Sequence, residues 1–143
     1  MKINKTASAK WTGGLKDGKG HISLESGAFK DQPYGFNTRF EDKEGTNPEE
    51  LVAAAHSSCF TMALSKILGE AGHTADNMNT TAKVTLEKIE GDFAVTSSLL
   101  NLEAKIPGIS EADFKEFAEK AKANCPISKL LKTDIGLEAK LIN

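Results

Sequence analysis

The segment 51–65 contains no Asp, Glu, Lys or Arg, and no other feature of the chain constrains the fold as strongly. Asn47 can cap a helix that begins at Pro48, and Glu50 stands at the capping-box position. Gly72 is suited to the helix exit. Because the segment has no charged face, we expect this helix to be buried on every side. A small domain offers too little surface to surround it, so we expect a partner chain to supply part of its cover.

The same segment is shorter than the ~20 residues that cross a bilayer, and the chain start shows no apolar stretch after its lysines. The 143 residues carry a formal net charge of −2 and contain no run of basic residues. This charge disfavours binding to nucleic acid or to an anionic membrane. We therefore expect a soluble, cytoplasmic protein that forms a single domain over residues 1–143.

Alternating apolar and polar residues predict β-strands on both sides of the long helix. We expect extended segments around Ile22 and at 35–40, 82–86, 93–106 and 135–141. The apolar phase shifts between Leu99 and Leu100, which predicts a β-bulge or a bend at that point.

Two shorter helices are predicted near the C-terminus. The first starts at Ser110, and Cys125-Pro126 ends it and opens a second, short helix. The apolar residues of the first follow helical spacing and are Phe114, Phe117, Ala118 and Ala121. The order of strands, long helix, hairpin, helices and strand predicts an α+β fold with largely antiparallel pairing.

Two isolated cysteines, Cys59 and Cys125, are the candidate reactive groups. In a reducing cytoplasm such residues are redox-active or inert more often than they form a structural disulfide. Cys59 lies too far into the long helix for the helix dipole to lower its pKa, so a thiolate there needs an outside cation. Cys125 precedes Pro126 at a helix start, where free N–H groups favour an anion, and local physics makes it the better nucleophile. Either thiol could instead be inert, Cys59 as a core residue and Cys125 in a turn.

Arg39 is the single arginine among 18 basic residues, and its guanidinium suits a thiolate or a peroxidic oxygen. It could instead form a surface ion pair with Glu41 or Asp42. Glu49 lies in the first turn of the long helix, where its default role is to favour the helix start. Ten residues, or ~15 Å of helix, separate it from Cys59, so the two share a site only through Arg39 or across two chains.

His56 lies one turn before Cys59 and is either its base or a core histidine with satisfied hydrogen bonds. Phosphate-binding loops, an HExxH motif, paired CxxC motifs and a GxSxG elbow are absent from the sequence. The spacing of Cys59, His56 and Cys125 matches no familiar zinc site. The residues by themselves are compatible with thiol chemistry and define it no further.

The sequence resembles the OsmC family in four ordered segments. Residues 32–40 read QPYGFNTRF, residues 45–51 read GTNPEEL, and residues 55–60 read AHSSCF. The fourth segment, ANCPIS at 123–128, matches the second cysteine motif of that family. Because Arg39 lies in the first segment, the resemblance is to the OsmC branch rather than to the sister Ohr group.

This resemblance implies an OsmC-like fold, in which curved antiparallel sheets wrap around a long central helix in an intertwined homodimer. It implies a thiol-dependent peroxidase that reduces organic hydroperoxides to alcohols, with Cys59 as the peroxidatic and Cys125 as the resolving cysteine. Arg39 would stabilise the Cys59 thiolate and bind the peroxide, and Glu49 would pair with Arg39. A small dithiol or a lipoylated protein would reduce the resulting disulfide, without a cofactor or a metal.

Two other functions fit the sequence. The chain could be a dimer that binds apolar ligands without catalysis, or a thiol redox sensor that oxidises once and signals to a partner. Repeated turnover of a hydroperoxide with a dithiol separates the peroxidase from both.

Overall fold

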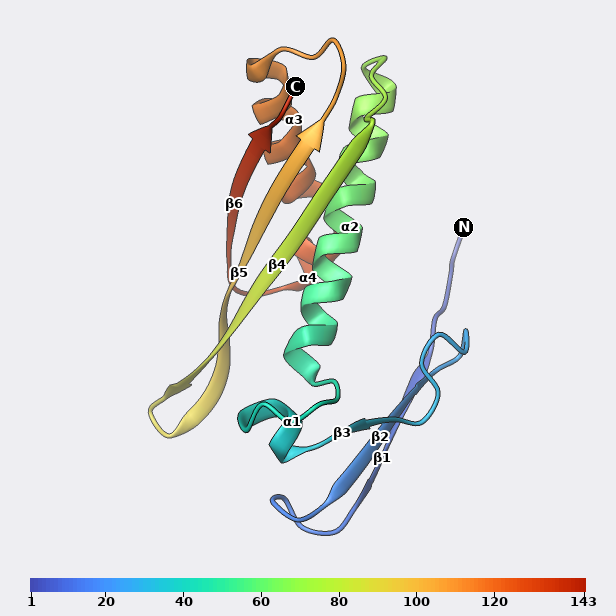
Figure 1. The fold of residues 1–143 in the computed structure, drawn as a ribbon, viewed down its shortest axis with the longest axis vertical. Coiled ribbons are helices and arrows are strands. Elements are labelled where there is room, and N and C mark those ends of the chain that lie inside the picture. The colour runs from blue at the N-terminus through green and yellow to red at the C-terminus, as the bar shows by residue number, and fades with distance from the viewer. The chain divides into compact units, whose positions relative to one another are not determined.

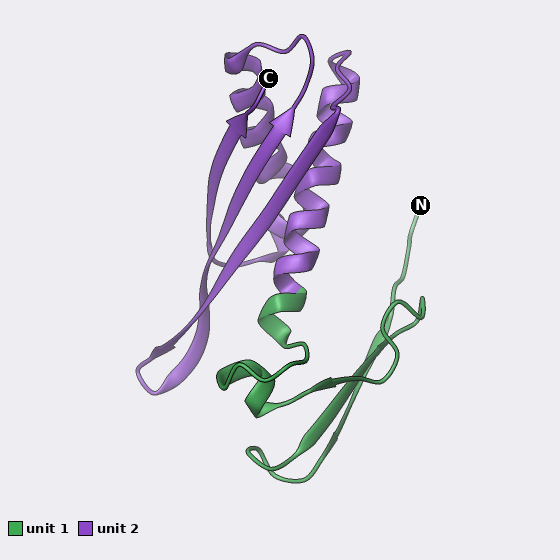
Figure 2. Ribbon diagram, viewed as in Figure 1, with its two compact units in different colours: residues 1–51 green, residues 52–143 purple.

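The computed structural model describes residues 1–143, which divide into two compact units, Met1–Leu51 and Val52–Asn143 (Figure 2). The expectation of one domain over the whole chain stays a prediction. The elements of the first unit are β1 (Ala7–Thr12), β2 (Lys19–Leu24), β3 (Gln32–Tyr34), α1 (Phe36–Phe40) and the start of α2 (Pro48–Glu70). Those of the second are the rest of α2, β4 (Asn77–Ile89), β5 (Asp92–Lys105), α3 (Glu111–Asn124), α4 (Pro126–Leu130) and β6 (Asp134–Leu141).

The first unit is built on a small antiparallel sheet in the order β1-β2-β3. Gly20 pairs with Trp11 on one side and with Tyr34 on the other. The rings of these two residues lie 5.6 Å apart, and a Cβ at position 20 would clash with both of them. All six residues of β1 are exposed, so this sheet contributes little to the buried core of the chain.

The prediction of an extended segment at 35–40 is wrong, because residues Phe36–Phe40 form the short helix α1. The hydroxyl of Thr38 accepts a hydrogen bond from the N–H of Gly35 at 2.9 Å and lies 3.0 Å from its carbonyl oxygen. These bonds give Gly35 the partners that a strand neighbour would otherwise supply. The rings of Phe36 and Phe40, one turn apart, contact each other in a tilted arrangement with their centroids 4.9 Å apart.

The predicted ends of the long helix are confirmed. The Asn47 side chain accepts the Glu50 N–H at 2.8 Å, and α2 begins at Pro48. At the other end Gly72 adopts φ +81, and the N–H of His73 bonds to the carbonyl of Leu68 at 2.8 Å, as in a Schellman motif.

Helix α2 is not buried on every side within one chain. Its fully buried residues form one stripe at intervals of four, His56, Phe60, Leu64 and Leu68. On another face Met62 is 72% exposed. Burial within a single chain therefore does not account for the absence of charged residues from the whole circumference of α2 at 51–65. By length and composition α2 could also span a membrane, a test that core helices of soluble proteins pass as well.

The second unit is a three-stranded sheet in the order β4-β5-β6 with α2, α3 and α4 on one face (Figure 1). Strands β4 and β5 form the predicted antiparallel hairpin, whereas β5 and β6 pair in parallel. The parallel pair departs from an all-antiparallel sheet, because α3 and α4 carry the chain back along the sheet between these two strands. The core side chains include Phe60 and Leu64 from α2, Leu100 and Leu102 from β5, and Phe114 and Ala118 from α3.

The predicted bulge between Leu99 and Leu100 is wrong in position. The register shift lies where Thr85 pairs with Ser97 and the next residue of β4 pairs with Val95. The apolar phase changes at Leu99 for another reason, because the polar Ser98 faces the core and is fully buried.

Candidate active site

The two cysteines meet in the second unit, although they lie on separate elements. Cys59 projects from the middle of α2, and Cys125 stands at the corner between α3 and α4. Their side chains are hydrogen-bonded to each other, and both are free thiols. Cys125 is fully buried, whereas Cys59 is only partly buried.

The corner at Cys125 is made by two consecutive helices. The Cys125 N–H closes the last turn of α3 on the Ala121 carbonyl at 2.9 Å, and the Cys125 carbonyl accepts the Lys129 N–H at 3.1 Å in α4. Pro126 occupies the first position of α4 and has no N–H, so Ile127 supplies the first free amide.

That amide bonds to Cys59 and not to Cys125. The backbone N–H of Ile127 donates to the Cys59 sulfur, and the Cys125 side chain makes no capping bond. The sequence assigned the favourable helix start to Cys125, whereas the geometry gives its amide to Cys59 and leaves Cys125 without exposed surface. The ranking of Cys125 as the better nucleophile rested on this amide, which in the structure is at Cys59 instead.

The pKa of the Cys59 thiol is nevertheless raised above its ordinary value. Burial is the largest cause, and the hydrogen bond and charge of Cys125 act in the same direction, because two thiolates in contact repel each other. The Ile127 N–H opposes this shift by donating to the thiolate. An uncompensated Cys59 thus needs a cation to react at neutral pH.

His56 is a core histidine with satisfied hydrogen bonds, which is one of the two roles predicted for it. Its Nδ1 lies 2.7 Å from Ser98 Oγ and its Nε2 lies 2.8 Å from Ser128 Oγ. Burial lowers the pKa of the imidazole, which therefore stays neutral. Because both ring nitrogens are occupied, His56 has no nitrogen left to take a proton from Cys59.

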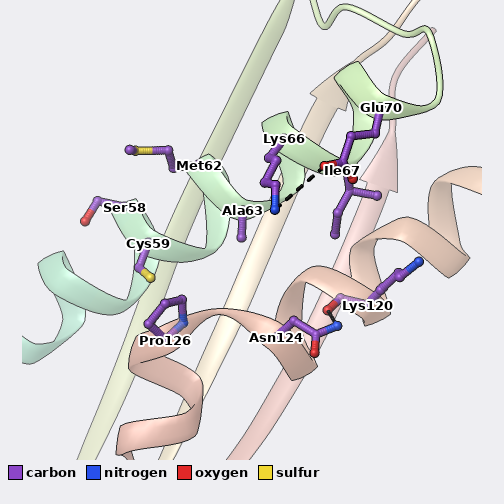
Figure 3. Close-up of a pocket in the computed structure, with 10 residues that line it drawn as sticks. All are labelled: Ser58, Cys59, Met62, Ala63, Lys66, Ile67, Glu70, Lys120, Asn124 and Pro126. Carbon is purple, nitrogen blue, oxygen red and sulfur yellow. Dashed lines mark hydrogen bonds and ion pairs between the residues drawn. The ribbon is translucent and has the colours of Figure 1, made fainter. Parts of the chain in front are cut away.

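An apolar groove of about 690 Å³ opens beside Cys59 (Figure 3). Helix α2 forms one wall, and residues of α3 and α4 form the other. The groove is lined near the thiol by Met62, Ala63 and Pro126, and farther away by Ile67, Lys66 and Lys120. It is wide enough for an organic substituent next to the Cys59 sulfur.

A second pair of predicted site residues lies in the first unit. Arg39 Nε is 3.0 Å from Glu49 Oε2, and Arg39 Nη2 is 2.5 Å from Glu49 Oε1. The side chains are 33% and 14% exposed, and the guanidinium also lies over the ring of Phe40 at 5.3 Å. Arg39 thus has Glu49 as its partner, and its bidentate geometry holds the guanidinium in one orientation.

The structure brings the four predicted site residues together as two pairs, Cys59 with Cys125 and Arg39 with Glu49. Sequence reasoning missed the amide of Ile127. The available signal was Pro126, which has no N–H and therefore leaves Ile127 as the first free amide of α4. It also missed Ser98 and Ser128, which complete the bonding of His56.

The chain is similar to a known protein family and to proteins within it. The OsmC family model, described as OsmC-like protein, matches residues 41–140. Over 141 residues the chain is 52% identical to peroxiredoxin OsmC of Escherichia coli, with 99% of both chains covered.

Two solved structures are similar over nearly the whole chain. An organic hydroperoxide resistance protein from Elizabethkingia anophelis has a TM-score of 0.72 at 29% identity and covers 100% of this chain and 99% of its own. An OsmC-like protein from Vibrio cholerae has a TM-score of 0.77 at 17% identity, covers 96% of this chain and 99% of its own, and shows the fold alone.

Proposed function

This chain belongs to the OsmC family and is a thiol-dependent peroxidase. We propose that it reduces organic hydroperoxides with Cys59 as the attacking thiolate and Cys125 as the resolving thiol. The contact between the two thiols is the observation that carries this proposal. Cys59 and Cys125 are far apart in sequence, and the fold brings their side chains together, as a disulfide between them requires.

Three features support Cys59 rather than Cys125 as the first nucleophile. Cys59 is partly exposed and lines the groove, whereas Cys125 is fully buried. The Ile127 amide donates to the Cys59 sulfur. The apolar lining of the groove fits the organic part of a hydroperoxide, whose oxygens would then lie near the thiol.

In the first step the Cys59 thiolate attacks the outer oxygen of the hydroperoxide. The O–O bond breaks, the S–O bond forms, and the alkoxide leaves and takes up a proton as the alcohol. Sulfur is oxidised to the sulfenic acid and the peroxide is reduced.

In the second step Cys125 attacks the Cys59 sulfenic acid. The disulfide forms and the hydroxyl leaves with the Cys125 proton as water. Burial of Cys125 keeps its thiol away from other oxidants until the sulfenic acid lies against it.

Arg39 supplies the cation that Cys59 needs. The family resemblance assigns Arg39 to the thiolate and the peroxide, and the raised pKa of Cys59 explains why a permanently charged group is required. Glu49 fixes the guanidinium through its two-point ion pair. The pair acts on Cys59 either of its own chain or of a second copy.

The protein works as a cytoplasmic homodimer. Helix α2 leaves Met62 exposed, and every residue of β1 is exposed in the single chain, so a second copy would cover apolar surface of both. A reducing compartment supplies the small dithiol or lipoylated protein that reduces the disulfide and completes the cycle.

Intact-mass spectrometry tests the two-cysteine reaction. One equivalent of cumene hydroperoxide is added to the reduced protein, to Cys59→Ser and to Cys125→Ser. We expect the loss of two hydrogens in the unmodified protein, one added oxygen in Cys125→Ser and no change in Cys59→Ser. An unchanged mass of the unmodified protein would mean that both cysteines are inert core residues and would favour a ligand-binding protein. A single oxidation that a dithiol does not reverse would favour a redox sensor.

A further inference from the structure

His56 forms a buried polar bridge between three elements. It projects from α2, its Nδ1 bonds to Ser98 on β5, and its Nε2 bonds to Ser128 on α4. His56 is fully buried, and Ser98 and Ser128 are 0% and 8% exposed. A neutral imidazole has one donor and one acceptor, so one serine donates to the ring and the other accepts from it. Burying three polar groups is costly unless each is bonded, and here each one is.

The His56 bridge and the contacts of Cys59 join the same two elements, α2 and the first turn of α4. His56 and Cys59 are three residues apart on α2 and share a face of the helix. Opposite them, Ser128 and Ile127 are adjacent in the first turn of α4. His56 thus bonds Ser128 in the same turn in which Cys59 receives the Ile127 amide.

We propose that His56 is a positioning residue of the peroxidase, which holds the first turn of α4 against α2 through Ser128 so that the Ile127 N–H and the Cys125 thiol stay on Cys59. Ser98 fixes the imidazole from the sheet, so that the ring cannot turn away from Ser128. This role rests on the proposed function of the two cysteines.

The physical reason is the shortness of α4. A helix of five residues has little stability of its own, and its place depends on contacts with neighbouring elements. Its exposed side chains, such as Leu130 at 70%, contribute little to that contact. Loss of the Ser128 hydroxyl would free the turn that carries the Ile127 amide and follows Cys125 directly.

The two serines provide a matched pair of variants. Ser128→Ala and Ser98→Ala each remove one hydroxyl from His56 and leave one ring nitrogen unpaired, but only Ser128 links the ring to α4. Ser128→Thr keeps the hydroxyl. Three quantities are measured for each variant: the melting temperature, the Cys59 pKa from thiolate absorbance at 240 nm in a Cys125→Ser background, and the rate of disulfide closure after hydroperoxide addition.

We expect both alanine variants to lower the melting temperature to a similar extent. Ser128→Ala alone should raise the Cys59 pKa and slow disulfide closure about fivefold to tenfold, since one hydrogen bond contributes ~1 kcal/mol. Ser128→Thr should restore both quantities. Equal changes in Ser98→Ala and Ser128→Ala, or no change in Ser128→Ala, would overturn the positioning role. If the unmodified protein forms no disulfide at all, the proposed function fails instead.

Discussion

Arg39 and Glu49 are joined by two parallel contacts, Nε to Oε2 at 3.0 Å and Nη2 to Oε1 at 2.5 Å. The guanidinium is thereby locked by one carboxylate at the start of α2, with its remaining N–H groups available to a further partner. Glu50, the next residue, bonds to the Thr46 hydroxyl at 3.1 Å and serves the helix start. Two adjacent carboxylates thus have different partners, which makes the role of Glu49 separable from that of a helix-start charge.

Glu49→Gln should lower kcat/KM for cumene hydroperoxide about tenfold. The amide keeps the shape of the side chain but loses a charge-assisted contact of ~1.5 kcal/mol or more, so the guanidinium is held less firmly. Steady-state kinetics with a dithiol measure the change, and Glu50→Gln is the control with the same change in charge. A similar loss in both variants would reduce Glu49 to a helix-start residue.

Arg39→Ala should change the pH dependence of the reaction. Without the cation only the Ile127 amide opposes the burial and the Cys125 contact that raise the Cys59 pKa, so the rate at neutral pH falls and keeps rising with pH beyond about 9, the ordinary value for the thiol. Stopped-flow rates across this range measure the profile. Lys43→Ala removes a positive charge nearby in sequence and should leave it unchanged. An unaltered profile in Arg39→Ala would remove this residue from the mechanism.

Ala63→Phe should reduce the preference for bulky substrates. Ala63 lines the groove next to Cys59, and a phenyl ring there would occupy the space of the organic substituent. We expect kcat/KM for cumene hydroperoxide to fall more than that for hydrogen peroxide, which needs no such space. Ala94→Phe, on the exposed end of β5, is the control. Equal losses for both peroxides would argue against the groove as the substrate site.

Met62→Glu should dissociate the proposed dimer. If a second copy covers this face of α2, a glutamate there would be buried without a partner, at a cost of several kcal/mol. Sedimentation velocity measures the molecular mass, and Met62→Leu should remain dimeric. A dimer that tolerates the glutamate would place the interface elsewhere.

Gly72→Ala should destabilise the fold by about 1 kcal/mol, because Gly72 adopts φ +81 at the end of α2. Gly69→Ala, one turn earlier, should instead stabilise the fold by roughly 0.5–1 kcal/mol, because no atom lies near its added Cβ and its backbone is helical. Urea unfolding measures both, and opposite signs are expected. No loss of stability in Gly72→Ala would show that the exit of α2 does not depend on the left-handed residue.

Local signals predicted the long helix well, since Asn47, Pro48 and Gly72 act on the backbone beside them. An extended segment is expected at 35–40 because it directly follows Pro33 and Tyr34, but the bonds from Thr38 to Gly35 stabilise a helix there instead. The polar Ser98 broke an apolar pattern because its partner, His56, lies 42 residues earlier, beyond any local reading.

The four candidate site residues were assigned only through the family resemblance. Local physics assigned the helix-start amide to Cys125, the residue nearest to it in sequence. In the fold that amide faces Cys59 on another helix. The parallel pairing of β5 and β6 was likewise not predictable, since strand order depends on how α3 and α4 pack.

The corner that holds Cys125 lies in the crossover between two parallel strands, and Cys59 lies before the hairpin that precedes it. A bond between these sulfurs would close a loop that contains β4, β5 and α3. In the unfolded chain such a loop loses conformational entropy equivalent to about 4 kcal/mol. Each catalytic cycle would then alternate between a chain that is free to unravel and one that is covalently tied, and the reduced form would be the one more open to unfolding and proteolysis.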